Sequence, residues 1–341
     1  MLYRKSSLSV GNSGVEDNVV SEHPVIGIDL GGTKVSTALV DSTGKIIAYD
    51  YRGTCAIEGP QVVIGRILDG ARGVMAQAGI KQSQVAAVGI GAPGPLDIEA
   101  GVVVAPPNLP GWDRVPLKQL IEDALGVTAF LENDANAAAL GEHRFGAGQG
   151  VAHMIYVTVS TGIGGGLILD GRLYHGASGM AGEIGHTTVV PYGPLCGCGN
   201  RGCLETMASG TAIARQARER VARCVPTLIA DLAEGDLEHI TAKLVAEAAS
   251  QGDVEAQEII AEAMHYLGIG MASLVNLFNP RLIVIGGGLT NIGESLFGPV
   301  RRAIDQRAFR AQAQAVRVVQ AELGDNAGVL GAAAVALAQL G

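Results

Sequence analysis

The 341-residue sequence contains no run of Lys or Arg, and its 33 Asp and Glu outnumber its 24 Lys and Arg, giving a formal net charge of −9. An acidic chain without a basic patch is a poor binder of nucleic acid, because binding to phosphates requires clustered cations. The most apolar tail, residues 326–341, is shorter than the roughly 20 residues that cross a bilayer. We therefore expect this tail to be an Ala-rich packed helix, and we expect neither a nucleic-acid nor a membrane partner.

The first 24 residues lack both a sustained apolar core and a small-residue cleavage site, which disfavours a signal peptide. We expect residues 1–24 to form a flexible extension and the protein to be cytoplasmic, where thiols stay reduced.

Two common nucleotide-binding motifs are also missing: there is no G-x-x-x-x-G-K-[ST], and no G-x-G-x-x-G opens a helix after a strand. Instead, three Gly-rich loops follow apolar runs: DLGGTK (29–34), STGIGGG (160–166) and IGGGLT (285–290). Such loops let backbone N–H groups reach phosphate oxygens. Lys34 can add positive charge, Thr33 and Thr161 hydroxyl donors, and Asp29 a ligand for Mg²⁺. Any one loop alone is more simply a hairpin turn, but the three together favour a nucleotide held between two halves.

The length exceeds what a single hydrophobic core usually supports, so we expect two domains. A strand, a Gly-rich hairpin and another strand open the segment 25–91 and recur from 153 to 170, which suggests two similar α/β halves facing a cleft. Helical patterns follow at 60–79, 115–126 and through most of 206–277, and a last helix begins near Asp325. We expect a small domain (25–134 plus 325–341) and a large domain (135–324).

Three of the five cysteines lie within eight residues, in CGCGNRGCLE at 196–205. A disulfide is disfavoured in a reducing compartment, and Cys196 and Cys198 are too close for easy bridging. Together with His186 and Cys203 they make a Cys₃His set, which suits a tetrahedral zinc ion. Such a site is filled by protein ligands, so the metal would be structural, within a zinc loop spanning 186–203. Two further cysteines, at positions 55 and 224, are most simply small buried apolar residues.

Asp134, in LENDANAAALGEH (131–143), lies where a predicted strand meets a predicted helix. An Asp or Asn before an Ala-rich run is ordinarily a helix N-cap. The alternative is a general base that accepts the proton of a phosphoryl acceptor. Glu183 and Glu205 are likewise either solvated surface charges or ligands of sugar hydroxyls. The second ring nitrogen of His186 would stay free to bond a ligand.

These motifs together resemble the ROK family of bacterial sugar kinases and repressors, from residue 25 to 341. CGCGNRGCLE fits the family signature C-x-C-G-x-x-G-C-x-E without departure. GEIGH fits the E-x-G-H motif, DLGGTK and STGIGGG the two phosphate motifs, and ENDAN the segment with the catalytic aspartate.

The resemblance implies an actin/hexokinase-like ATPase fold (ribonuclease H-like), two α/β domains closing on a sugar, and often a homodimer or homotetramer. Asp134 would be the catalytic base. The implied sugar-binding residues are Gly94, Asn133, Asp134, Glu183, His186 and Glu205. The implied Mg-ATP residues are Asp29, Gly31, Gly32, Thr33, Lys34, Thr161, Gly162, Gly287 and Gly288. The implied zinc ligands are His186, Cys196, Cys198 and Cys203.

The stretch NLPGWDRVPL (108–117) resembles the version found in glucokinases of this family, so the expected reaction is ATP-dependent phosphorylation of the 6-hydroxyl of glucose. Fructose, mannose, N-acetylglucosamine and N-acetylmannosamine stay open as substrates, and polyphosphate as donor. Two other classes compete: a sugar-sensing regulator without turnover and a zinc-dependent interaction module. A repressor with an N-terminal DNA-binding domain is disfavoured, because 24 residues without helical pattern precede the first strand.

Overall fold

The computed structural model describes residues 23–340, so all but the last two residues of the expected N-terminal extension lie outside the described part. The first of two main sheets has the order β3-β2-β1-β4-β7. Its strands are β1 (Val25–Leu30), β2 (Lys34–Val40), β3 (Ile46–Gly53), β4 (Val88–Ala92) and β7 (Ala129–Asn133). The first three strands form an antiparallel meander, and β1, β4 and β7 run parallel.

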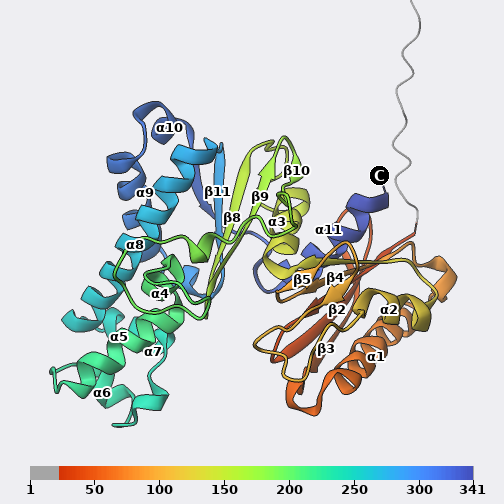
Figure 1. Cartoon of the computed structure of the whole chain (residues 1–341), viewed down its shortest axis with the longest axis horizontal. Helices are drawn as coiled ribbons and strands as arrows, with labels where there is room; N and C mark the ends of the chain where they lie inside the picture. The colour runs from red at the N-terminus through yellow and green to blue at the C-terminus, as the bar shows by residue number, and fades with distance from the viewer. Residues whose placement is uncertain (1–22, 341) are drawn as a thin grey trace, which may run out of the picture.

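Helices cover both faces of this sheet (Figure 1). On one face pack α1 (Pro60–Ala78) and α2 (Leu117–Leu125), over a core that includes Ile28 and Ile90. Both helices end as predicted, at Gly79 and Gly126 in the left-handed conformation. The other face is covered by α11 (Ala327–Leu340), the Ala-rich tail helix.

The second sheet repeats this topology, with the order β10-β9-β8-β11-β12. Its strands are β8 (Met154–Val159), β9 (Ile163–Leu169), β10 (Arg172–Leu173), β11 (Leu282–Gly286) and β12 (Arg317–Gln320). Again three antiparallel strands are followed by parallel ones. The two similar α/β halves expected from the sequence are thus confirmed.

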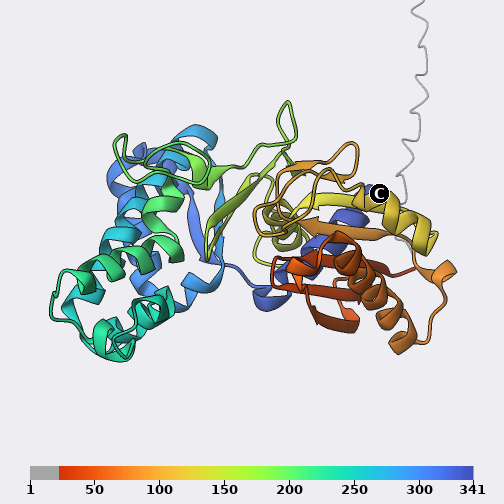
Figure 2. The same cartoon turned by 60° about the horizontal axis from the view of Figure 1, so that its bottom comes forward.

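The second half carries most of the helices (Figures 1 and 2). They are α4 (Leu204–Ala208), α5 (Gly210–Ala222), α6 (Leu228–Leu232), α7 (Ala242–Ser250), α8 (Val254–Phe278), α9 (Glu294–Arg307) and α10 (Arg310–Ala315). Helix α8 and its neighbours pack on one face of the second sheet, and α3 (Asp134–Phe145) packs on the other face. No helix in the range 23–340 is both long and apolar enough to span a bilayer.

Two helices, α3 and α11, cross between the halves and pack closely against each other (Figure 1). A Cβ at Gly141 would come within 2.9 Å of the backbone of Gly331, so the two backbones meet without intervening side chains. The chain passes from the first sheet to the second through α3, and it returns through α11. The domain limits at 134/135 and 324/325 agree with this path and stay a prediction.

The sequence had not predicted strand β12, the short hairpin of β5 (Leu96–Asp97) and β6 (Val102–Val103), or helices α9 and α10. The three strands are too short for periodicity to identify them, whereas α9 is long enough and was missed.

Candidate active site

The parallel strands of the first sheet bring the predicted catalytic residues to one edge. Asp29 pairs with Gly91 in the β1–β4 register, and Ala92 pairs with Asn133 in the β4–β7 register. Because parallel strands end at the same edge, the phosphate hairpin after β1, the loop after β4 with Gly94, and Asp134 after β7 lie side by side.

Asn133, rather than Asp134, is the N-cap of α3. Its side-chain oxygen accepts hydrogen bonds from the backbone N–H groups of Ala135 (3.0 Å) and Asn136 (3.2 Å). The Asp134 carboxylate accepts a hydrogen bond at 2.8 Å from the N–H of Ala135, the residue next to it. The capping alternative for Asp134 is therefore wrong, and most of this carboxylate's hydrogen-bonding capacity is left for a ligand.

Three carboxylates share this region. Asp134 is accessible to solvent, yet protein atoms crowd its carboxylate, and this loss of hydration raises the pKa of Asp134 to about 6, with added repulsion from Asp29 and Glu183. Burial also raises the pKa of Asp29, and the Lys34 ammonium opposes that rise. A carboxylate with a pKa near neutrality can accept a proton during a reaction.

The GEIGH segment forms a short 3₁₀ turn, Ile184–His186, anchored by the buried side chain of Ile184. Glu183 precedes this turn, and its carboxylate lies 3.8 Å from Nε2 of His186. Glu205, at the start of α4, accepts a hydrogen bond at 2.9 Å from the N–H of Ile163. A Cβ at Gly162 would overlap the Glu205 carboxylate, so a larger residue at 162 would displace this carboxylate. One of the predicted sugar-binding residues thus contacts the second Gly-rich loop.

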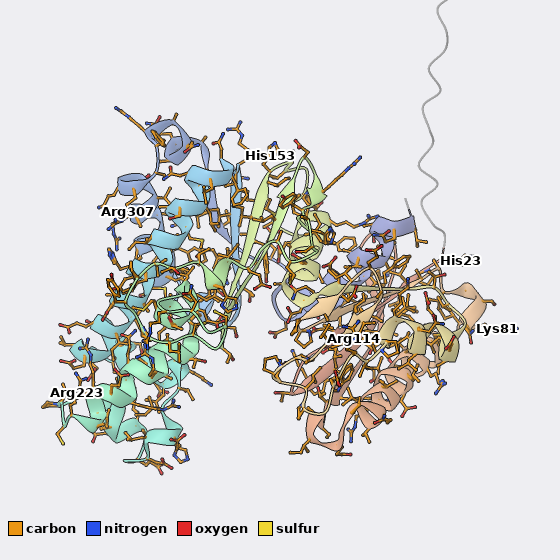
Figure 3. All side chains as sticks on the ribbon, in the orientation of Figure 1. His23, Lys81, Arg114, His153, Arg223 and Arg307 are labelled. Atoms are coloured by element: carbon orange, nitrogen blue, oxygen red, sulfur yellow. The ribbon has the colours of Figure 1, made fainter. Side chains whose placement is uncertain are left out.

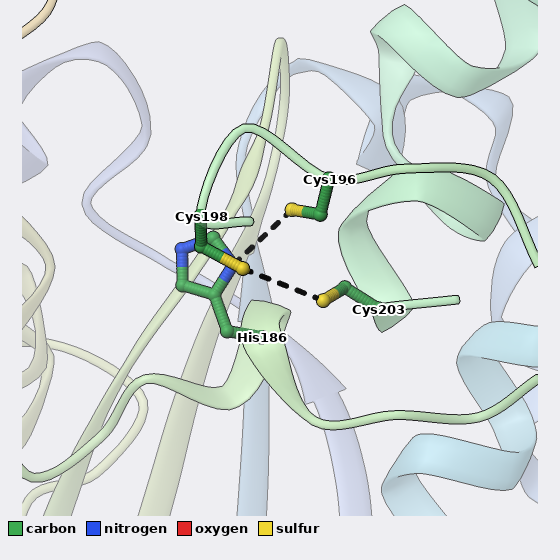
Figure 4. Close-up of side chains that lie close together, drawn as sticks. All are labelled: His186, Cys196, Cys198 and Cys203. Carbon is green, nitrogen blue, oxygen red and sulfur yellow. Dashed lines mark hydrogen bonds between the residues drawn. The ribbon is translucent and has the colours of Figure 1, made fainter. Parts of the chain in front are cut away.

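His186 and the three clustered cysteines converge as predicted (Figure 4). Their ligand atoms all lie within 4.8 Å of one another. Sγ of Cys196 is 3.6 Å from Nδ1 of His186, and Sγ of Cys198 is 3.7 Å from Sγ of Cys203. The edges of a tetrahedron around one metal ion with metal–sulfur bonds of about 2.3 Å are similarly long. This group can hold a metal ion, with Nε2 of His186 directed away from it.

In the second sheet, the loops after β8 and β11 meet because these strands are parallel, with Gly286 opposite Thr158. Gly287 has φ +86°, and a Cβ there would overlap the backbone of Val159. The N-terminus of α5 joins them: the N–H of Gly210 donates to the carbonyl of Ser160 at 2.7 Å, and the hydroxyl of Thr211 to that of Thr161.

A cavity of about 640 Å³ opens beside these loops. Its lining includes Thr161, Gly210, Arg218, Ile240, Lys243 and Gly288. The Arg218 guanidinium donates to the carbonyls of Leu237 and Ile240, both at 2.9 Å, and so holds the segment that closes one wall. Sequence reasoning predicted the Gly-rich rim of this cavity but missed the part supplied by α5 and α7, which lies more than 40 residues downstream of Thr161 and carries no motif.

The first hairpin is also supported by residues that the sequence did not single out. Thr54 donates its hydroxyl to the carbonyl of Gly31 at 2.6 Å and its N–H to that of Thr33 at 2.8 Å. Asn108, from the NLPGW stretch, packs against Gly32, where a Cβ would come within 2.9 Å of it.

The prediction that the two remaining cysteines are buried apolar residues is wrong. Cys55 and Cys224 are exposed, with φ of +50° and +56°. Both occupy turn positions at helix ends, where the backbone is at the surface, so they are not core residues.

A sequence profile of the ROK family matches residues 25–339. The chain belongs to the ROK family. It is 41% identical to a glucokinase of Thermotoga maritima, over 93% of this chain and 98% of that protein. It is 34% identical to a xylose repressor of Caldicellulosiruptor bescii, over 93% of this chain and 78% of the repressor.

Among solved structures, a ROK family glucokinase from Streptomyces griseus in complex with glucose and AMPPNP aligns with a TM-score of 0.77 and 38% identity, over 91% of this chain and 98% of that one. The predicted actin/hexokinase-like ATPase fold is confirmed by these neighbours and by the two sheets of like topology.

Proposed function

We infer that this protein is an ATP-dependent hexokinase of the ROK family that phosphorylates the 6-hydroxyl of glucose. The observation that carries this inference is Asp134: a carboxylate at a strand end, relieved of helix capping by Asn133, with its pKa raised to about 6. The glucokinase relatives and the neighbour with glucose and AMPPNP support the choice of sugar and nucleotide.

In the proposed reaction, the bond from phosphorus to the sugar oxygen forms as the bond to the leaving ADP oxygen breaks, and Asp134 accepts the hydroxyl proton. Mg²⁺, bound with the nucleotide, offsets negative charge on the phosphates. Asp29 would hold that ion, and the Lys34 ammonium lies close enough to Asp29 to oppose the rise of its pKa. The hydroxyls of the sugar would bind Asn133, Glu183, Glu205 and Nε2 of His186, with the backbone at Gly94.

On the nucleotide side, we assign the phosphates to the Gly-rich hairpin (Gly31, Gly32, Thr33) and to the loops with Thr161, Gly162, Gly287 and Gly288. We assign the nucleoside to the 640 Å³ cavity, whose size suits a small organic ligand. Apolar lining at Ile240 and Leu289 suits a base.

We assign zinc to the Cys₃His group, because three thiolates and one imidazole at tetrahedral spacing match its preferred ligands. The ion would fix the fold of the 186–203 loop and the orientation of His186. A site of three thiols suits a reducing compartment, so we propose that the protein is cytoplasmic, and a homodimer or homotetramer stays a prediction.

The test is a coupled ADP-release assay with Mg-ATP across glucose, mannose, fructose, N-acetylglucosamine and N-acetylmannosamine, repeated with polyphosphate by direct detection of sugar phosphate. A dominant kcat/KM for glucose with ATP supports the proposal. Preference for an amino sugar keeps the kinase and changes the substrate. Sugar binding without phosphorylation by either donor contradicts the kinase and favours a sugar sensor, the class of the repressor relatives.

A further inference from the structure

A buried carboxylate directly precedes the residues of the sugar site. Glu132 is the penultimate residue of β7 and only 4% exposed. Its Oε1 accepts hydrogen bonds from the backbone N–H of Asn133 (2.9 Å) and from Nδ2 of Asn136 (3.0 Å). This carboxylate therefore joins the end of β7 to the first turn of α3.

The other oxygen of Glu132 bonds a residue from the opposite half of the molecule. Oε2 lies 2.7 Å from Nε2 of His175, 43 positions away. His175 is half-exposed and lies two residues after the end of β10. The hydrogen bond to Glu132 raises the pKa of His175, and Glu132 is the charged group that faces this imidazole. Charge-assisted hydrogen bonds of this length are among the strongest in proteins.

His175 lies near the start of the segment that leads to Glu183. At the start of this segment (174–183), the N–H of Tyr174 donates a hydrogen bond to the carbonyl of Leu167. Within the segment, the N–H of Ala181 donates to the carbonyl of His175 at 3.0 Å and so closes a loop. Its middle, at Gly179, lies next to Ile98 of the β5–β6 hairpin. Its end, at Gly182, faces the buried Oδ1 of Asn136, for which no partner is found among residues 23–340.

We propose that Glu132 and His175 form a positioning pair that sets the distance between the two sides of the sugar site, by holding the 174–183 segment with Glu183 against the strand end with Asn133 and Asp134. This proposal rests on the proposed sugar-kinase function for its kinetic readout. Neither residue contacts the reacting atoms. Their effect on catalysis passes through Asn133 and Glu183, because a site held by its supporting residues binds without further ordering.

The ionic state of the pair gives the sign of its pH dependence. The pKa of His175 is raised in the folded protein, so the charged pair is complete below that pKa and weakens as the pH rises through it. Affinity for the sugar should therefore fall on the alkaline side. Protonation of Asp134 lowers activity at acidic pH instead, so the two effects occur in different pH ranges.

The experiment compares wild type, Glu132→Gln, His175→Asn and the double variant in steady-state kinetics from pH 6 to 9. We expect each single variant to raise the KM for the sugar roughly tenfold at pH 7, with a smaller change in kcat and an unchanged KM for ATP. The double variant should be no worse than the worse single variant, since the two residues act through one contact. The alkaline rise of KM should be absent from all three variants.

His153→Asn is the matched control. His153 is also a half-exposed histidine near a carboxylate, 3.6 Å from Asp170, but it lies at the rim of the second sheet (Figure 3). It should leave the KM for the sugar and its pH profile unchanged. Additive effects of the two substitutions, or an alkaline rise of KM that persists in Glu132→Gln, would overturn the proposal.

A second measurement is independent of turnover. Hydrogen exchange of the 174–183 peptide should be faster in His175→Asn than in wild type at pH 6, while peptides of α8 stay unchanged. If wild type phosphorylates no sugar but this peptide responds as expected, the proposed function fails and the pairing holds. Equal exchange in wild type and His175→Asn would contradict the pairing itself. This comparison does not depend on whether Glu132→Gln folds.

Discussion

The carboxylate of Glu142 accepts a hydrogen bond at 2.9 Å from the backbone N–H of Leu323, a residue 181 positions away. It also accepts from the N–H groups of Glu322 (3.2 Å) and Ala147 (3.0 Å). Glu142 is fully buried near the C-terminal end of α3. The two segments it joins are the two connections between the halves of the molecule, one leaving α3 and the other entering α11.

Glu142→Gln should lower the free energy of unfolding by about 3 kcal/mol, because the amide replaces one acceptor oxygen by N–H donors that face backbone N–H groups. Urea unfolding measures this loss. Glu322→Gln is the control, since Glu322 contributes only its backbone N–H to this contact and its side chain is exposed. Equal stability of the two variants would show that Glu142 does not hold the connections together.

Asp134→Asn should reduce kcat by 10² to 10⁴-fold, within the usual range for a general base, while glucose still binds in calorimetry. In wild type, kcat/KM should fall below a pH of about 6, since the raised pKa of Asp134 marks where the base becomes protonated. Retention of near-normal kcat in Asp134→Asn would contradict the assignment of the base.

The raised pKa of Asp134 favours stability at low pH, whereas it favours activity at high pH. A carboxyl whose folded pKa is raised stabilises the fold at low pH, and that contribution disappears as the pH rises through about 6. Asp134→Asn should therefore have a higher Tm than wild type at pH 8 and a similar Tm at pH 4. A Tm difference that does not change with pH would argue against the shifted pKa.

The sequence allowed the fold and the motif residues to be predicted because local signals carry them. Gly79 and Gly126 mark helix ends, and apolar runs before Gly-rich loops mark the strands whose ends meet at the site. The Cys₃His group followed from spacing and ligand chemistry alone.

What the sequence did not provide are contacts between distant segments. The pairing of Glu132 with His175 and the contact of Glu142 with Leu323 depend on how two sheets are oriented, which no periodicity encodes. Which of Asn133 and Asp134 caps α3 depends on a backbone angle at one junction, since either side chain is a good cap. The exposure of Cys55 and Cys224 follows from turn conformations that composition does not predict.

Ala246→Phe should raise the KM for ATP by at least about tenfold and leave the KM for glucose unchanged, because a phenyl ring at this position enters the 640 Å³ cavity assigned to the nucleoside. Ala249→Phe is the control. Ala249 lies one turn further along α7 and lines only an adjacent cavity, which Ala246 also borders. Direct titration with ADP measures both, and equal affinity of the two variants for ADP would place the nucleoside elsewhere.

Cys198→Ser tests the metal group without touching its buried members, because Cys198 is the exposed cysteine of the three in this group. Serine is a poor zinc ligand, so we expect the zinc content by mass spectrometry to fall well below one ion per chain. The KM for glucose should rise, since the ion orients His186, and the KM for ATP should change less. Cys224→Ser, at an exposed cysteine away from the group, should retain the zinc content and kinetics of wild type. Full zinc content in Cys198→Ser would exclude Cys198 from the ligand set, and a KM for glucose that stays normal in a zinc-free protein would separate the metal from the sugar site.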